Sequence, residues 1–175
     1  MLPRSATTIT ALALGVVMAA AGSVGAADRD HPVVIELFQS QVWTPQVVVN
    51  GRIDTVGTRR GEIEQVIAKA DRGLGGPAVS AAGGRVTLNG AARTSPAEVW
   101  LVRYDPGIIQ VPIRRGENGG KTLPHRNVVR ELVKLGDWSG ARRDYVLPRA
   151  GPANLKSAIL VQQGRGGGAI AAARL

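Results

Sequence analysis

Short apolar runs separated by polar or glycine-containing breaks dominate the first half of the chain, a pattern typical of β-strands. Residues 33–38 form one such run, in which a single glutamate is the one charged residue. A second run at 46–49 is followed directly by Asn50-Gly51. Because Asn-Gly is the dipeptide most typical of a type I′ hairpin turn, the pattern predicts a further strand at 52–56.

The period of the apolar positions changes after this strand. Four residues follow the spacing i, i+3, i+4, i+7 of one helix face, and these are Ile63, Val66, Ile67 and Ala70. Thr58 can cap the N-terminus of such a helix, and Gly73 can end it in the left-handed conformation. The pattern therefore predicts an amphipathic helix at 60–71.

Residues 73–84 are rich in Gly, Ala and Pro and are predicted to be a linker. Beyond them, short apolar runs and turn signals recur at close intervals, which is typical of a small antiparallel β-sandwich. The predicted strands are 85–88, 97–104, 108–115, 127–135, 144–147, 158–162 and 169–173.

Two of these assignments depend on a choice between structures. Asp105-Pro106-Gly107 is a turn triplet, so 97–104 and 108–115 are predicted as separate strands on either side of it. Residues 127–135 also fit one helix face, but the flanking glycines and the β-branched residues favour a strand.

The N-terminus has the pattern of an export signal. Arg4 supplies a positive charge, residues 9–21 are nearly all apolar, and small residues precede Asp28. Such a run suits a signal peptide and is shorter than the ~20 residues of a spanning helix. We predict a signal peptide at 1–27 and a secreted or periplasmic location, with a buried core helix as the alternative. No later segment is long and apolar enough to span a membrane.

The composition limits the reactions and partners that this chain can have. The chain has no Cys, so it can neither form a disulfide nor use a thiol. Its two His are too few for a multi-histidine metal centre, and neither a metal nor a cofactor is predicted. Lys and Arg outnumber Asp and Glu by 22 to 13. This excess of positive charge is consistent with binding to anionic envelope polymers or with a simply solvated surface. Aromatic residues make up only 3% of the chain, so no nucleic-acid partner is predicted.

Several segments, in their order along the chain, carry a family resemblance. They are 34–41, 44–51, 115–118, 127–130, 136–138 and 172–175. With these segments the chain resembles a family of secreted bacterial proteins with a thioredoxin-like N-terminal half, domain of unknown function 1223. The resemblance extends over nearly all of the chain that follows the predicted signal peptide.

The resemblance also implies a segment that this chain lacks. In the family pattern, a Cys-x-x-Cys segment and a helix, strand and helix stand between the positions of Gln41 and Thr44. Only two residues separate them here, so a whole βαβ unit of roughly 30 residues is absent. Residues 39–45 would then close a long-looped hairpin between 33–38 and 46–50, with the predicted helix over one face. The other face would lack its helices, which makes it prone to aggregation or open to a partner.

The resemblance assigns Glu36, Thr44 and Pro45 as the remnant of the thioredoxin-like site. Pro45 matches the position of a cis-proline beside the dithiol, and Glu36 that of a buried carboxylate that relays protons to a thiol. Plainer alternatives stay open. Pro45 also suits the start of a strand, and Glu36 also suits a solvated strand edge or an ion pair with Arg52.

Other arrangements have plainer explanations than chemistry. Ser40 with His31 or His125 could nominally form a hydrolase triad, but the sequence has no nucleophile-elbow pattern. Residues 164–168 lack the Lys-Ser/Thr of a phosphate-binding loop, so they are predicted to be a hairpin loop. The candidates for a carboxylate pair, all in predicted turns or loops, are Asp105, Glu117 and Asp137.

The sequence as a whole predicts an α+β, mostly β fold. It consists of an incomplete thioredoxin-like β-meander with one helix at 28–72, the linker at 73–84 and a small antiparallel β-sandwich at 85–175. The predicted function is non-catalytic binding by an exported thioredoxin-like protein that lacks its redox dithiol. The alternatives are a thiol–disulfide oxidoreductase family member whose active-site segment is missing from this chain, and an anion-binding envelope module. The partner is unknown, and the uncovered sheet face is where a protein partner could bind.

Overall fold

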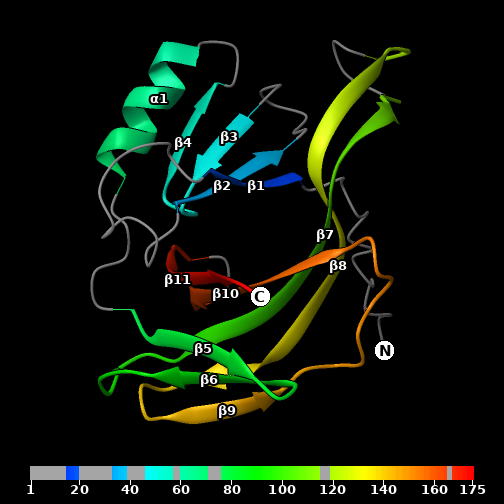
Figure 1. Ribbon diagram of the computed structural model, residues 1–175. Helices are drawn as coiled ribbons and strands as arrows, with labels where there is room; N and C mark the ends of the chain where they lie inside the picture. Colours follow the sequence, from blue (N-terminus) through cyan, green and yellow to red (C-terminus); the bar gives the residue numbers. More distant parts are fainter. Residues whose placement is uncertain are drawn as a thin grey trace, which may run out of the picture.

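The computed structural model describes residues 15–19, 33–38, 46–56, 60–70, 76–114, 119–164 and 167–175, and it confirms an α+β, mostly β fold (Figure 1). Within this described part, the strands form two sheets and one helix accompanies them. The elements are β1 (Gly15–Ala19), β2 (Val33–Phe38), β3 (Gln46–Val49), β4 (Ile53–Val56), α1 (Arg60–Lys69), β5 (Ala78–Ala82), β6 (Arg85–Asn89), β7 (Ala97–Pro112), β8 (Thr122–Trp138), β9 (Arg143–Val146), β10 (Lys156–Gln163) and β11 (Ala169–Arg174).

The larger sheet has eight strands in the order β11-β10-β7-β8-β1-β2-β3-β4, and the smaller sheet has the order β5-β6-β9. Every pair of neighbouring strands is antiparallel. The two longest strands, β7 and β8, pair with each other and extend over most of the height of the molecule (Figure 1). Since β8 includes 127–135, the choice of a strand there is confirmed.

The N-terminal strands form the predicted meander. β2 pairs antiparallel with β3, which is the expected long-looped hairpin, and β3 pairs with β4. Asn50 and Gly51 have positive φ angles of 53° and 63°, as a type I′ turn requires at its two central residues. The N–H of Arg52 closes this turn by donating to the carbonyl oxygen of Val49 at 3.1 Å.

The predicted helix face is also present. Three partly buried residues of α1 pack against the buried Val47, Val49 and Ala70, and these three are Ile63, Val66 and Ile67. The spacing in the sequence therefore predicted the face of α1 that contacts the meander. The predicted cap and stop residues, Thr58 and Gly73, lie outside the described residues.

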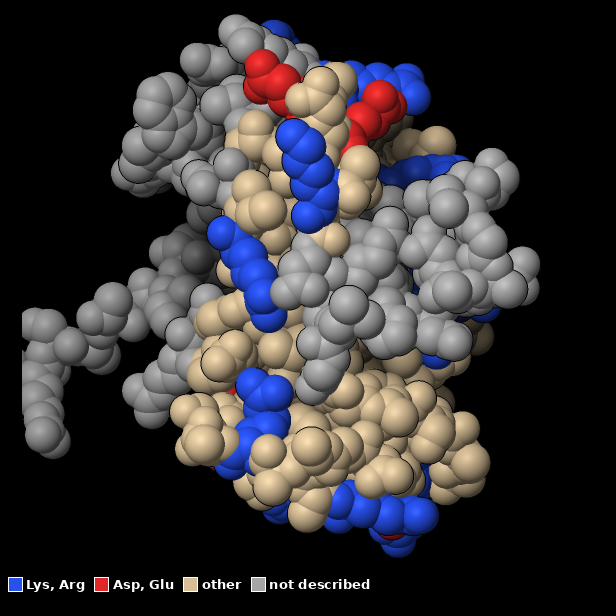
Figure 2. Space-filling model, turned by 90° about the vertical axis from the view of Figure 1, so that its left-hand side faces the viewer, with Lys and Arg blue, Asp and Glu red and all other residues tan. Residues whose placement is uncertain are grey.

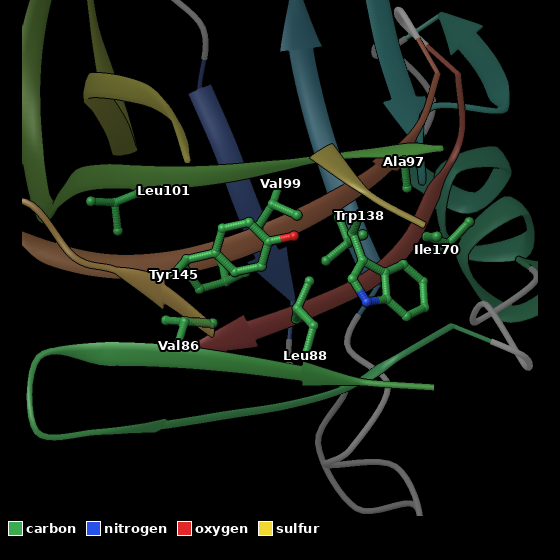
Figure 3. Close-up of a cluster of buried hydrophobic side chains, with 10 residues drawn as sticks. Val86, Leu88, Ala97, Val99, Leu101, Trp138, Tyr145 and Ile170 are labelled. Atoms are coloured by element: carbon green, nitrogen blue, oxygen red, sulfur yellow. The ribbon is translucent and has the colours of Figure 1, made fainter. Parts of the chain in front are cut away.

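The C-terminal strands form the predicted sandwich. The small sheet packs against strands of the large sheet, with a cluster of buried side chains between them (Figure 3). The cluster consists of Val86, Leu88, Ala97, Val99, Leu101, Trp138, Tyr145, Ile159, Val161 and Ile170. Trp138 is its largest member and is only 1% exposed. Its indole N–H donates to the carbonyl oxygen of Ala141 at 2.8 Å, so the polar atom of this buried ring is satisfied.

Part of the predicted linker is a strand. Within 73–84, residues 78–82 form β5, and each of them pairs with a residue of β6. Gly83 and Gly84, with positive φ angles of 55° and 73°, form the tight turn between the two strands. The prediction of a linker was wrong here because four of the five side chains are exposed and small or polar, and backbone pairing with β6 holds the strand.

The turn triplet at 105–107 does not reverse the chain. β7 continues through it, and the register moves from Asp105 opposite Val128 to Ile108 opposite Arg126, which makes a β-bulge. The Asp105 carboxylate accepts a hydrogen bond from the backbone N–H two residues later at 2.9 Å. The prediction of two separate strands was therefore wrong, because the local Asp-turn forms while β8 pairs on both sides of it.

β1 lies inside the predicted signal peptide. At these five positions the structure has a strand and not the alternative core helix. β1 pairs with β2 over five residues and with β8 at Gly15 opposite Val128. It is therefore the strand that joins the N-terminal meander to the strands of the sandwich in one continuous sheet.

Candidate binding site

The residues assigned as a remnant of a thioredoxin-like site are only partly described. Glu36 lies in the middle of β2, opposite Val16 of β1 and Val48 of β3. Thr44 and Pro45 lie outside the described residues. With β1 in place, β2 is an interior strand, so the backbone of Glu36 is not at the solvated strand edge that the sequence left open.

The candidate carboxylate pair is separated by the sandwich. Asp137 lies opposite Glu98, and Asp105 lies seven residues further along β7. At ~3.3 Å per residue, this separation is about 23 Å, too long for two carboxylates to act on one bond. Asp105 and Asp137 therefore cannot work as an acid/base pair in this fold.

The structure describes part of the nominal hydrolase triad and part of the glycine-rich connection at 164–168. His125 lies in β8, with Nδ1 3.0 Å from the carbonyl oxygen of Leu123. The connection at 164–168 joins β10 to β11, and the N–H of Gln163 donates to Gly168 across it at 3.0 Å. The predicted hairpin loop is thus confirmed. The candidates that lie outside the described residues are His31, Ser40 and Glu117.

The charged side chains of the sandwich stabilise it and do not converge on a site. Among the described residues, no group of three or more His, Asp or Glu side chains could hold a metal ion. Lys134 binds Asp137 at 2.8 Å and Glu98 at 2.7 Å. Hydrogen bonds to Asp137 and then to Glu98 raise the pKa of Lys134 above its ordinary value. This exposed network ties β7 to β8.

Arg103 is a buried cation that sequence reasoning missed. It is 6% exposed and forms an ion pair with Glu131 of β8. Its second guanidinium nitrogen donates to the carbonyl oxygens of Pro148 at 3.2 Å and Arg149 at 2.6 Å. The planar guanidinium thus clamps the segment before β10 onto β7 and β8. The signal in the sequence is one arginine after an apolar run at 99–102.

The contact between the meander and the sandwich is narrow. β1 meets β8 at one backbone pair, whereas it meets β2 at five. The partner on β8, Val128, is 7% exposed, and its neighbour Asn127 has a positive φ of 53° at the β7–β8 bulge. A second contact joins the β3–β4 turn to the start of β11, where the N–H of Ala169 donates to the carbonyl oxygen of Asn50 at 2.8 Å.

We call the place between β2 and β8 that β1 fills the strand slot. One wall is the backbone of β2 along all five residues of β1, and the other is the backbone of β8 at Val128. Such backbone edges bind an extended segment through N–H and carbonyl groups. β1 runs antiparallel to both walls, so β2 and β8 run in the same direction. The strand slot is the candidate binding site of this chain, because the strand that fills it lies within the predicted signal peptide.

Within the described residues, the fold is that of a mostly β protein with two antiparallel sheets, in the larger of which β1 lies between β2 and β8. The model of the family of proteins of unknown function DUF1223 matches residues 22–162. The chain therefore belongs to the DUF1223 family. No curated protein matches the chain, and no helix in the described ranges has the length and apolar character needed to cross a membrane.

The fold is similar to a crystal structure of a protein from Agrobacterium tumefaciens, solved by a structural genomics consortium. The two share 22% sequence identity, with a TM-score of 0.55. The match covers 78% of this chain and 63% of the Agrobacterium protein, so this chain spans less than two thirds of that protein's length. At this identity, the similarity establishes the common fold.

Proposed function

We propose that this chain is an exported, non-catalytic binding protein related to thioredoxin-like proteins, from which the segment with the redox dithiol is missing. The observation that carries the proposal is the absence of Cys from the whole sequence, since thiol–disulfide exchange requires a thiolate. The N-terminal meander with α1 on one side supports the thioredoxin-like relationship. The 63% coverage of the Agrobacterium protein supports a shortened chain.

Export is tested by the mass of the protein recovered from the periplasm or medium of an expressing bacterium. We expect a chain that begins at Asp28, because small residues precede it and the apolar run before them suits a signal peptide. The matched control replaces Ala27 with Arg, which is too large for the small-residue cleavage site. A chain that keeps residues 1–27 in the exported fraction would overturn the predicted cleavage, and absence of the chain from the periplasm and the medium would overturn export.

Loss of the dithiol is tested at the gene and in a redox assay. The genomic sequence and the transcript across the Gln41–Val42 junction should read in frame, without an intervening Cys-x-x-Cys segment. The purified chain should leave the rate of insulin reduction by dithiothreitol at its uncatalysed value, with a dithiol-containing thioredoxin as positive control. Coding sequence for a Cys-x-x-Cys segment at the junction would favour the alternative of an oxidoreductase whose active site is missing from this chain.

Binding to anionic envelope polymers is a second candidate function. Figure 2 shows Lys and Arg side chains from the top to the bottom of one face, whereas the visible Asp and Glu side chains gather mainly at the top. A formal net charge of +9 favours association with anions through long-range electrostatics. We expect retention on a heparin column that falls as salt increases; elution without retention at low salt would exclude this candidate.

A further inference from the structure

The strand slot would change state when the signal peptide is removed. In the chain described here the slot is filled by Gly15–Ala19, which precede the predicted cleavage site after Ala27. Cleavage would remove β1 and leave two sheet edges without a neighbour, one on β2 and one at Val128 of β8. Gly15 is the residue of β1 that pairs with both neighbours, and at its level the two edges would stand about 10 Å from each other, because adjacent strands lie ~4.8 Å apart.

The occupant of the slot shows which kind of segment fits it. Gly15–Ala19 has the sequence Gly-Val-Val-Met-Ala, which is uncharged and lies extended and antiparallel to β2, with Gly15 opposite Leu37 and Ala19 opposite Val33. A segment in such a position is bound mainly through backbone hydrogen bonds. Binding therefore depends more on an extended conformation of the segment than on its particular sequence.

We propose that the processed chain binds an extended, uncharged apolar segment of a partner polypeptide, about five residues long, in the strand slot and antiparallel to β2. This proposal rests on the proposed export, because export frees the slot. A second copy of this chain fits less well, since its own β2 already pairs with β3 on one side and could reach only one wall of the slot.

The slot is tested with a synthetic peptide of residues 15–19, carrying lysines at both ends for solubility and a fluorescent label. One receptor is the exported chain, and the other is the full chain with Val16→Pro and Val17→Pro. Neighbouring residues of an interior strand direct their backbone N–H groups to opposite sides. One of two consecutive prolines therefore removes a donor that faces β2, and the missing N–H and fixed φ of the pair disfavour pairing of β1 with β2, which opens the slot without cleavage. The unaltered full chain, with its slot filled, is the matched control.

We expect saturable peptide binding by the exported chain and by the proline variant, and none by the unaltered full chain. Binding should slow hydrogen exchange by about tenfold or more at those backbone amides of 33–38 that face the slot and not β3. The same peptide with proline in place of both valines should not bind. These results would support an open, strand-accepting slot.

The inference would be overturned if the peptide bound neither open receptor. It would also be overturned if the amides of 33–38 that face the slot were already protected in the exported chain without peptide, as when β2 closes onto β8. Protection that rises with protein concentration, together with a doubled mass in sedimentation, would assign the slot to a second copy and reject a partner polypeptide. An exported chain that keeps its first 27 residues rejects cleavage alone, because the proline variant tests the slot without cleavage.

Discussion

The sandwich and the N-terminal meander use different amounts of buried surface to hold their strands. Ten buried side chains fill the space between the two sheets of the sandwich, and six of them are 0% exposed. Among the side chains that the structure describes in the meander and α1, three buried residues form one cluster, and α1 itself contains no buried residue. Burying a large apolar side chain contributes about 1.5–3 kcal/mol, so we expect the described sandwich core to stabilise the fold more than this cluster does.

This difference explains why β1 matters. A helix that buries none of its residues adds little to the strands beneath it, so pairing along the sheet becomes the main support of the meander. That pairing reaches the sandwich through β1 and its single backbone pair with β8. We therefore expect the meander to exchange one strand for another more readily than the sandwich does.

The largest effect is expected from Trp138→Ala. The substitution removes the largest fully buried side chain and its hydrogen bond to Ala141. We expect a loss of about 3–5 kcal/mol in the free energy of unfolding, measured by urea denaturation followed by circular dichroism. Val146→Ala is the control, since Val146 is 66% exposed and should cost less than about 0.5 kcal/mol. Equal losses in both variants would contradict a core centred between the two sheets.

Val49→Ala should destabilise the meander without destabilising the sandwich. Val49 is 1% exposed and belongs to the small cluster beneath α1. We expect a loss of about 2 kcal/mol that is confined to the meander, visible as faster hydrogen exchange in β3 and β4 but not in β10. Ile53→Ala, at the 41% exposed residue opposite Val49, is the control and should change exchange less. Equally faster exchange in β10 would mean that the regions unfold as one unit.

Limited proteolysis offers a smaller contrast between the regions in the unaltered chain. We expect protease to cut within residues 33–72 before it cuts within 85–175, with first cleavages about tenfold apart in rate, which corresponds to about 1.4 kcal/mol in opening free energy. Mass spectrometry of the early fragments gives the cut sites. Equal protection of 33–72 in a monomer would contradict the comparison.

Sequence patterns predicted the elements whose signal is local. The spacing of Ile63, Val66 and Ile67 gave the contact face of α1, and Asn50-Gly51 gave the β3–β4 turn. The errors arose where a distant partner decides the structure. Small residues at 78–82 form a strand because β6 pairs with them, and the triplet at 105–107 bulges because β8 continues past it.

The candidate site was predicted less well than the fold for the same reason. Glu36 was correctly placed on a strand, but the neighbours of β2 follow from the order of strands in the sheet. An apolar segment such as Gly15–Ala19 carries the same local signal in a signal peptide, a helix or a strand. The ion pair of Arg103 with Glu131 likewise joins residues that are far apart in sequence.

The smallest expected effect is a pH dependence of the free energy of unfolding that is confined to the sandwich. Burial is the main cause that raises the pKa of Tyr145 above 10.0, and its hydroxyl donates to the carbonyl oxygen of Asp137 at 2.9 Å. The folded state therefore holds the phenol proton more tightly than the unfolded state. This contribution to stability is complete below pH 10 and is lost as the pH rises from there through the folded pKa. Tyr145→Phe should remove this part of the alkaline loss.

The measurement compares urea midpoints of the unaltered chain and Tyr145→Phe between pH 8 and pH 11. Lys134, whose pKa is also raised, weakens the fold in the same direction at still higher pH, but it is present in both proteins and cancels in the difference. Tyrosinate absorbance in a Tyr104→Phe background reports Tyr145 alone, because the chain has two Tyr. We expect the difference in midpoints to shrink as the pH rises, while hydrogen exchange in the meander stays the same for both proteins. A constant difference would assign Tyr145 a packing role without a titration, and a matching change in the meander would show that the small core beneath α1 depends on the sandwich.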